Sequence, residues 1–115
     1  MSEDCLFCKI ASGDVPADII FQDDDYVAFR DINAQAPTHL LVIPRKHIAS
    51  LDRATDADGR LLGGALLVAR DVARQAGIAE KGYRTVINTN RQAHQSVFHL
   101  HLHVLGGREM KWPPG

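Results

Sequence analysis

The segment His99-Leu100-His101-Leu102-His103 alternates histidine with leucine at every second position. In a β-strand, side chains two residues apart point to the same face of the sheet. The alternation therefore predicts a strand over residues 97–105, with three imidazoles on one face and apolar side chains on the other. Imidazole can serve near neutral pH as nucleophile, acid, base or metal ligand. Because burying three such rings is costly unless each has a partner, we predict that this strand carries the functional site.

Three interpretations of the histidine segment come into question, and spacing alone does not separate the second from the third. In the first, the rings are buried and hydrogen-bonded with no further role, but three histidines in register beside a polar loop disfavour it. A His-x-His pair on a strand can also chelate zinc or copper. In the third interpretation, one imidazole attacks an electrophile while its neighbours bind the displaced charge.

Size and charge limit the classes of protein to consider. The 115 residues, 45% hydrophobic and 23% charged, predict one globular domain over residues 1–115. A net charge of −1 gives no electrostatic reason to expect nucleic acid or a membrane as partner. There is no apolar run of the roughly 20 residues that a membrane span needs. The acidic start, Met1-Ser2-Glu3-Asp4, lacks the features of a signal peptide, so we expect a cytoplasmic protein.

The two cysteines lie three positions apart, in Cys5-Leu6-Phe7-Cys8. A reducing compartment argues against a structural disulfide. A thioredoxin-like redox site would follow a strand, and no strand precedes Cys5. Two thiolates at this spacing can instead provide half of a tetrahedral zinc site, which would need two further ligands from elsewhere in the chain.

The remaining pattern predicts an α+β fold with a mainly antiparallel sheet, one long helix and a short N-terminal helix. The short helix is expected over residues 5–11 and a hairpin of strands over 19–21 and 26–30. Further strands are expected over 39–43 and 84–88, with a loop at 34–37. The long helix is predicted over residues 56–75, capped by Thr55 or Asp56 and followed by Gly77. Gly63-Gly64 inside it indicates a close packing neighbour. Its expected buried stripe is Leu61, Leu62, Ala65, Leu66, Ala69, Val72 and Ala73.

Several stretches together resemble one known family. Residues 95–105 (QSVFHLHLHVL) resemble the signature of the histidine triad (HIT) superfamily. Residues 29–32 (FRDI), 36–39 (APTH) and 42–47 (VIPRKH) resemble its nucleotide-binding half. The end of the chain, with 105–108 (LGGR) and 112–115 (WPPG), is similar to the Hint branch of purine nucleoside phosphoramidases. The resemblance covers nearly the whole chain and implies the HIT-like fold.

The resemblance also implies a reaction, the hydrolysis of purine nucleoside phosphoramidates of the adenosine 5′-phosphoramidate type. In the family the middle histidine, here His101, attacks the α-phosphorus and forms a nucleotidyl-histidine. Water then releases the nucleoside monophosphate. His103 and Ser96 match positions that contact the phosphate and help the amine leave, and His39 supports the strand. The implied catalytic residues are His101, His103, Ser96, His99 and His39.

The nucleotide-binding residues follow from the same resemblance. Asp31 matches the carboxylate that accepts hydrogen bonds from both ribose hydroxyls, and Asn88 matches a contact on the phosphate side. Ile10, Phe29, Ile32 and Leu41 are expected to form the apolar walls of the base pocket. The predicted nucleotide-binding set is completed by Gln95, Ser96, His101 and His103.

Two departures from the family pattern stand out. The loop before Gln95 is usually glycine-rich, whereas here it contains Arg91 and His94, which predicts altered anion contacts or leaving-group preference. Cys5 and Cys8 match a zinc pair in other branches of the superfamily, where the site is completed by the positions of His47 and His99. Such a closed Cys₂His₂ shell is typical of structural zinc. We therefore expect that catalysis requires no cofactor. Whether a structural zinc ion is bound stays open at this point.

The resemblance further implies a homodimer with purine nucleoside monophosphates and phosphoramidates as ligands. The rigid, apolar tail Trp112-Pro113-Pro114-Gly115 is expected to dock against the partner. Alternatives to the phosphoramidase are a dinucleoside polyphosphate hydrolase, a nucleotide-binding regulatory protein with incidental turnover, and a metal-storage or metal-sensing module.

Overall fold

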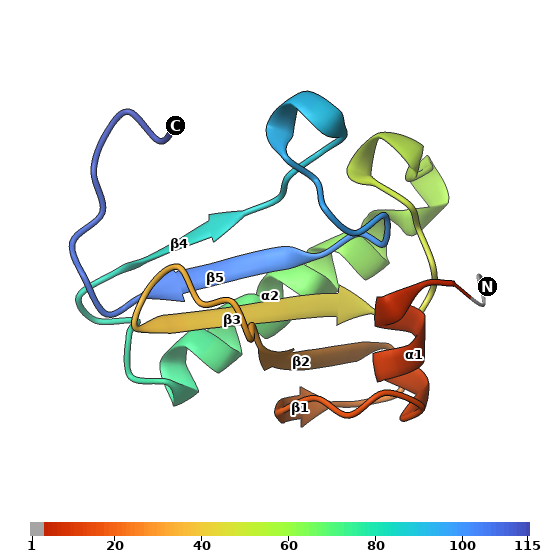
Figure 1. The fold of residues 1–115 in the computed structure, drawn as a ribbon, viewed down its shortest axis with the longest axis horizontal. Helices are drawn as coiled ribbons and strands as arrows, with labels where there is room; N and C mark the ends of the chain where they lie inside the picture. Colours follow the sequence, from red (N-terminus) through yellow and green to blue (C-terminus); the bar gives the residue numbers. More distant parts are fainter. Residues whose placement is uncertain (1–3) are drawn as a thin grey trace.

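The fold is built on one antiparallel sheet of five strands (Figure 1). The computed structural model describes residues 4–115, so the expectation for the first residues of the chain, 1–3, lies outside the described part. The strands lie in the order β1-β2-β3-β5-β4, and every neighbouring pair is antiparallel. Their bounds are β1 Ile19–Gln22, β2 Tyr26–Arg30, β3 Thr38–Pro44, β4 Tyr83–Val86 and β5 Leu102–Gly106.

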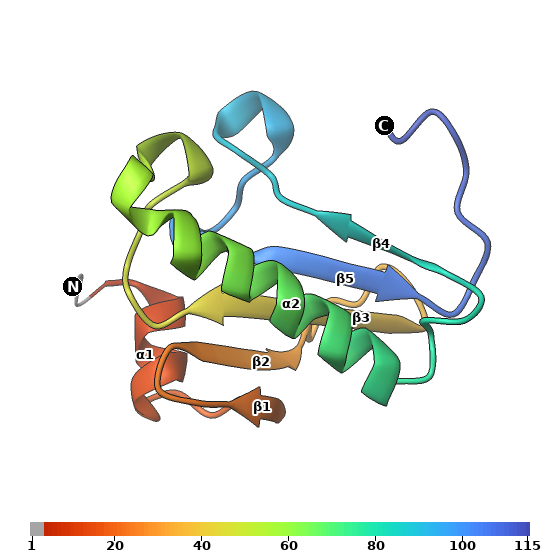
Figure 2. The same cartoon turned by 180° about the vertical axis from the view of Figure 1, so that it is seen from behind.

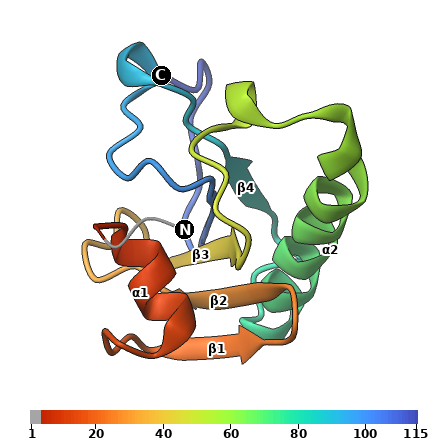
Figure 3. The same ribbon diagram turned by 90° about the vertical axis from the view of Figure 1, so that its right-hand side faces the viewer.

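Two α-helices cover opposite faces of the sheet, as the side view shows (Figure 3). The short α1, Leu6–Ser12, lies against one face, and the long α2, Gly59–Gln75, crosses the other (Figure 2). Short 3₁₀ turns occupy η1 Leu51–Arg53, η2 Asp56–Asp58 and η3 Arg91–Ala93. This arrangement confirms the predicted α+β fold with one long and one short helix. None of the helices in residues 4–115 is long and apolar enough to cross a membrane.

Alternation along the central strands divides the core into two clusters. On β2, Ala28 packs in the cluster beneath α2, whereas Val27 and Phe29 pack in the cluster beneath α1. On β3, Leu40 and Val42 belong to the α2 side, and Leu41 to the α1 side. This is the period of two that a sheet covered on both faces requires. The site described below lies on the α1 side.

The hairpin and α1 agree closely with the sequence prediction. Asp23 Oδ1 accepts hydrogen bonds from the backbone N–H groups of Asp25 and Tyr26, which fixes the acidic turn between β1 and β2. Arg45, just after β3, donates to the carbonyl oxygens of Asp23 and Ala11 and thereby ties the end of α1 to this turn. The helix that contains Cys8 and follows Cys5 is therefore held against the sheet.

The long helix differs from its prediction in two details. Residues 56–58 form a 3₁₀ turn, in which the Asp58 carboxylate accepts from the Thr55 backbone N–H, and the α-helix begins at Gly59. Leu66 was expected in the buried stripe, but its side chain is 51% exposed. The stripe is centred on Ala65, Val68 and Val72, and Leu66 lies beyond its margin.

The close packing neighbour predicted for the glycine pair in α2 is present at one of the two positions. A Cβ on Gly64 would collide with the ring and hydroxyl of Tyr26, whose hydroxyl donates to the Leu61 carbonyl at 2.6 Å. Gly63 has no such neighbour among the described residues. Gly64 is therefore the position where the absence of a side chain lets the helix sit on β2.

The prediction of a histidine strand over residues 97–105 was wrong at its N-terminal end, because β5 begins only at Leu102. Residues 97–101 have no strand partner. Instead, the Leu100 backbone N–H donates to the Ile48 carbonyl, and the His99 side chain bonds the Pro44 carbonyl at the end of β3. These two contacts hold the chain away from the ladder, so that His99 and His101 lie just before the strand and His103 within it.

Candidate active site and metal centre

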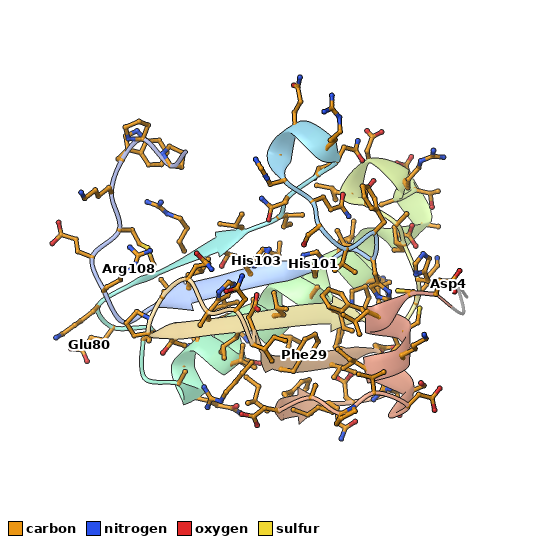
Figure 4. The ribbon with its side chains drawn as sticks, in the orientation of Figure 1. Asp4, Phe29, Glu80, His101, His103 and Arg108 are labelled. Carbon is orange, nitrogen blue, oxygen red and sulfur yellow. The ribbon has the colours of Figure 1, made fainter. Side chains whose placement is uncertain are left out.

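A cavity of about 240 Å³ lies between α1 and the sheet. The helix contributes Ile10, β2 and its continuation contribute Phe29 and Asp31, and β3 contributes Leu41. His101 and His103 lie side by side above Phe29 in Figure 4. The cavity is lined, among others, by eight of the residues predicted from the sequence: Ile10, Phe29, Asp31, Ile32, Leu41, Ser96, His101 and His103.

Hydrogen bonding fixes the tautomer of His101. Its Nδ1 lies 2.7 Å from the His99 carbonyl oxygen, and a carbonyl only accepts, so Nδ1 carries the proton. The opposite nitrogen, Nε2, bonds to nothing within residues 4–115 and therefore keeps its lone pair. Burial lowers the pKa of His101, and the edge of Phe7 packs against its ring at 5.0 Å between centroids. The result is a neutral imidazole with a free, basic nitrogen at the cavity.

A chain of hydrogen bonds also orients His103. The Gln35 backbone N–H donates to Nδ1 of His39, so the proton of His39 is on Nε2. This Nε2 faces Nδ1 of His103 at 2.9 Å and Oδ2 of Asp31 at 3.4 Å. Nδ1 of His103 therefore accepts, and its proton lies on Nε2. His103 thus offers one N–H donor at the cavity.

Burial also keeps His103 neutral. Desolvation of the ring, reinforced by the neighbouring His101 and His39, lowers the pKa of His103 to about 4. Burial likewise lowers the pKa of His39, although the Asp31 carboxylate opposes the shift. Near pH 7 the cavity therefore presents one basic nitrogen and one neutral donor, 5.0 Å apart between ring centroids.

The loop before Ser96 is held by two amide side chains. Buried Gln95 donates from Nε2 to the carbonyls of Ala49 and Val97, and its Oε1 accepts from the Asn90 backbone N–H. Asn88 donates from Nδ2 to the Ala93 carbonyl. The structure thus uses the amides of Gln95 and Asn88 to shape the loop, while their predicted contacts with a nucleotide stay predictions.

This loop contains backbone conformations that favour glycine. Asn90 has φ 68° and ψ −173°, and His94 has φ 61°. Residues other than glycine reach such conformations at a cost of about 1–3 kcal/mol each, and they persist where the surroundings hold them. Here the hydrogen bonds of the Gln95 and Asn88 side chains provide that support.

The four predicted metal ligands gather at the N-terminal end of α1. One ligand atom from each of Cys5, Cys8, His47 and His99 lies within 4.8 Å of all the others. Nδ1 of His99 lies 3.3 Å from Cys5 Sγ, 3.5 Å from Cys8 Sγ and 3.2 Å from Nδ1 of His47. A tetrahedral zinc site, with Zn–S of about 2.3 Å and Zn–N of about 2.0 Å, separates its ligand atoms by roughly 3.3–3.8 Å. The cluster has dimensions close to these.

The protonation state of His99 also suits a metal. Its Nε2 lies 2.7 Å from the Pro44 carbonyl and must donate, which leaves the lone pair on Nδ1 directed at the two thiols. A metal-binding histidine usually has its other nitrogen held in this way. The donor set and the tautomer of His99 therefore both fit zinc.

A second cluster of candidate ligands, Asp31, His39 and His103, fits a metal poorly. The nitrogen of His39 that faces the cluster, Nε2, carries a proton because the Gln35 N–H occupies Nδ1. A metal at Nε2 would have to displace that proton. We interpret this group as a hydrogen-bond chain.

Comparisons with known proteins identify the family to which this fold and histidine pattern belong. The HIT domain family matches residues 12–110, and the chain belongs to this family. An uncharacterized HIT-like protein of Synechococcus elongatus is 53% identical over the full length of both chains.

Solved structures show the same fold. A HIT family hydrolase from Legionella pneumophila Philadelphia 1 superimposes with a TM-score of 0.95 and 54% identity, over 97% of this chain and 100% of that one. A zinc-bound histidine triad family protein from Mycobacterium smegmatis gives a TM-score of 0.81 and 35% identity, over 91% of this chain and 76% of that one.

Two contributors to the site were missed by sequence reasoning. Phe7 packs against His101, and its spacing of three from Ile10 on a helix is a signal that could have placed it on the same face. The backbone N–H of Gln35 sets the tautomer of His39. The sequence contains no signal for this contact, because every residue except proline has a backbone N–H group.

Proposed function

We propose that this protein hydrolyses the phosphorus–nitrogen bond of purine nucleoside phosphoramidates. The observation that carries the proposal is the hydrogen bond from His101 Nδ1 to the His99 carbonyl, which leaves Nε2 free at the cavity between α1 and the sheet. A neutral imidazole nitrogen held in this way is a good nucleophile near neutral pH. The hydrolase name of the Legionella relative supports the reaction class.

In the proposed reaction, His101 Nε2 attacks the α-phosphorus and the phosphorus–nitrogen bond breaks. The leaving nitrogen takes a proton from solvent water, and the amine departs. The N–H of His103 and the hydroxyl of Ser96, both at the cavity, are donors for the phosphate oxygens and the leaving nitrogen. Water then attacks the nucleotidyl-histidine, releases the nucleoside monophosphate and restores His101.

The apolar and acidic parts of the cavity support nucleoside binding. Phe29, Leu41 and Ile10 provide an apolar surface for a base, and Ile32 lies fully exposed at the rim. Asp31 provides a carboxylate for the ribose. Its Oδ1 already accepts from the Asn33 backbone N–H, and that bond holds the carboxylate in place.

The function test is turnover of adenosine 5′-phosphoramidate with no divalent metal added, followed by detection of adenosine monophosphate and ammonia. We expect turnover, and a dinucleoside polyphosphate offered in parallel should be a poorer substrate. Rapid quenching and mass spectrometry should find a nucleotidyl adduct on the protein. Faster cleavage of the dinucleoside polyphosphate would assign the protein to that alternative, and binding without cleavage of either would indicate a regulatory protein.

Replacing Asp31 with alanine should weaken binding of adenosine monophosphate at least tenfold, while binding of the 2′-deoxy analogue changes much less. The carboxylate forms charge-assisted hydrogen bonds, of roughly 1.5–3 kcal/mol each, only where hydroxyls are present. Calorimetric titration measures both affinities. The matched control is Asp31→Asn, which keeps an acceptor oxygen near His39 and should lose less. Equal losses for both nucleotides would mean that Asp31 acts only through His39.

We further propose that zinc occupies the Cys5, Cys8, His47 and His99 cluster and stabilises the fold. The dimensions of the cluster and the zinc-bound Mycobacterium relative support this assignment. With all four ligands from the chain, the ion would have no open position for substrate. Zinc would then hold α1 to the loop that carries His101, and the reaction itself needs no cofactor.

A homodimer in the cytoplasm, in which residues 1–115 act as one HIT domain, completes the proposal. Leu66 and Leu67 on the outer surface of α2 are 51% and 53% exposed, and β4 is an open edge of the sheet. Trp112 is 81% exposed, and Arg84 of β4 holds this tail by donating to the Lys111 carbonyl. Exposed apolar side chains beside a free strand edge are typical of a protein interface.

A further inference from the structure

The hydrogen-bond chain behind His103 begins outside the catalytic cavity, in the loop of residues 31–37 that joins β2 to β3. The Gln35 backbone N–H donates to Nδ1 of His39, and Nε2 of His39 donates to Nδ1 of His103. Gln35 is exposed, whereas His39 is buried. The donor that sets the tautomer of a buried ring thus belongs to an exposed loop, so other contacts must fix the position of that loop.

Bonds within the loop fix part of its shape. The Asn33 backbone N–H donates to Oδ1 of Asp31, and the Gln35 side chain donates from Nε2 to the Asn33 carbonyl. The Asp31 backbone N–H donates to the His39 carbonyl at the base of the loop. Asn33 and Gln35 are both exposed, so these bonds compete with water. By themselves, exposed bonds of this kind leave a loop free to open locally.

Arg108 holds the same loop from another part of the chain. Its Nη2 donates to the Gln35 carbonyl at 3.1 Å, and its Nη1 donates to the Glu109 carbonyl at 3.2 Å. Because Thr38 at the start of β3 pairs with Gly106 at the end of β5, the residues after β5 run beside the loop that precedes β3. Figure 4 shows Arg108 beyond the end of β5, on the side away from His101.

The close approach of these two segments depends on Gly107. A Cβ on Gly107 would lie 2.9 Å from Cβ of Pro37, and the φ of Gly107 is 91°, which also favours glycine. The chain after β5 therefore packs directly against the loop, and this brings the Arg108 guanidinium to the Gln35 carbonyl. The contact follows from the course of both backbones, in addition to the length of the arginine side chain.

Loss of the Gln35 contact would change what His103 offers at the cavity. A neutral imidazole carries its proton on either ring nitrogen. With no donor at Nδ1, His39 can hold its proton there, and its Nε2 then accepts from Nδ1 of His103. His103 would then present a bare Nε2 in place of an N–H donor. Oδ2 of Asp31, 3.4 Å from Nε2 of His39, favours the original tautomer, so the exchange would be partial.

We propose that Arg108 is a positioning residue for the reaction. By holding the Gln35 carbonyl, it keeps the Gln35 N–H on His39 and thereby keeps the proton of His103 on the nitrogen at the cavity. This inference rests on the proposed function, in which that N–H serves the phosphate oxygens and the leaving nitrogen. Because charge develops on these atoms in the transition state, Arg108 acts on the rate more than on nucleotide affinity.

The kinetic test compares three variants with wild type on adenosine 5′-phosphoramidate. Arg108→Ala should lower kcat about tenfold, part of the roughly 10²–10³-fold cost of losing a transition-state donor, and leave KM within about twofold. Arg108→Lys keeps one donor for the Gln35 carbonyl and should recover most of the rate. The matched control is Lys81→Ala. Lys81 is an exposed cation that lines the same surface cavity as Arg108 and bonds to none of residues 31–39, so its loss should change neither value.

Nitrogen NMR of the histidine rings gives a readout that a merely structural role would not move. At about pH 8, where histidine is ordinarily neutral, the protonated ring nitrogen of both His39 and His103 in wild type should be Nε2. Arg108→Ala should shift both rings toward the Nδ1-protonated form. Gln35→Pro, which removes the N–H itself, should do so at least as strongly. Ring signals in Arg108→Ala that match wild type would overturn the proposal, whatever the rate.

The same measurements separate this proposal from the proposed function. If adenosine 5′-phosphoramidate is cleaved, an unchanged kcat in Arg108→Ala, or equal losses in Arg108→Ala and Lys81→Ala, would also overturn the positioning role. If wild type does not cleave the substrate, the proposed function fails. The NMR comparison then decides by itself whether Arg108 sets the tautomer of His103.

Discussion

Replacing His101 with alanine should reduce turnover of adenosine 5′-phosphoramidate by at least a thousandfold and leave nucleotide affinity within a few-fold of wild type. The variant lacks the Nε2 that forms the bond to phosphorus, whereas the surfaces of Phe29 and Asp31 are unchanged. Loss of a nucleophile commonly costs several orders of magnitude in rate. Single-turnover kinetics measures the rate, and titration with adenosine monophosphate measures the affinity.

Mass spectrometry of quenched samples gives this prediction its second readout. Wild type should carry a nucleotidyl group on the peptide that contains His101, and the alanine variant should carry none. Ser12→Ala is a control away from the cavity, because the Ser12 hydroxyl donates to the Lys9 carbonyl at the C-terminal end of α1. It should keep both the adduct and most of the rate. More than a tenth of wild-type activity in the alanine variant would rule out covalent catalysis by His101.

Replacing Cys8 with alanine should remove bound zinc and lower the melting temperature by roughly 10 °C, which corresponds to about 2 kcal/mol for a domain of this size. Cys8 is 3% exposed, and its Sγ lies 3.4 Å from Nδ1 of His47 and 3.5 Å from Nδ1 of His99. Turnover should fall as well, by less than in the His101 variant, because His99 also provides the carbonyl that orients His101.

Elemental analysis and calorimetric melting check the zinc prediction together. The control Ser12→Ala alters the other end of α1, where the hydroxyl donates to the Lys9 carbonyl, and should leave the zinc content unchanged. Wild-type protein that contains no zinc, and whose melting temperature does not respond to added zinc, would contradict a structural metal at this cluster.

Local patterns along the chain were sufficient to predict most of the fold. The acidic turn at Asp23, the apolar runs of β2 and β3 and the helical spacing of α2 can each be recognised within a few residues, and the structure contains the expected elements. The prediction that Leu66 is buried was wrong. Helical periodicity identifies the centre of the buried face of a helix, whereas the width of that face depends on how the helix packs against the sheet.

Contacts between distant segments explain what the sequence did not predict. The start of β5 is delayed because Leu100 and His99 bond to Ile48 and Pro44, some fifty residues earlier in the chain. The tautomers of His39 and His101 depend on two backbone groups, the Gln35 N–H and the His99 carbonyl. Both are backbone groups, which almost every residue has whatever its side chain. The histidine pattern therefore identifies the reactive rings but does not indicate which ring nitrogen carries the proton.

The split of the core into two clusters has a consequence for how such a protein can diversify. The larger cluster, under α2, holds the sheet together through residues such as Leu40, Val42 and Val72, and none of these lines the catalytic cavity. The smaller cluster, under α1, includes Phe29 and Leu41, which do. Substitutions that retune the ligand pocket therefore leave the larger cluster unchanged, and their cost in folding free energy falls on the smaller cluster under α1.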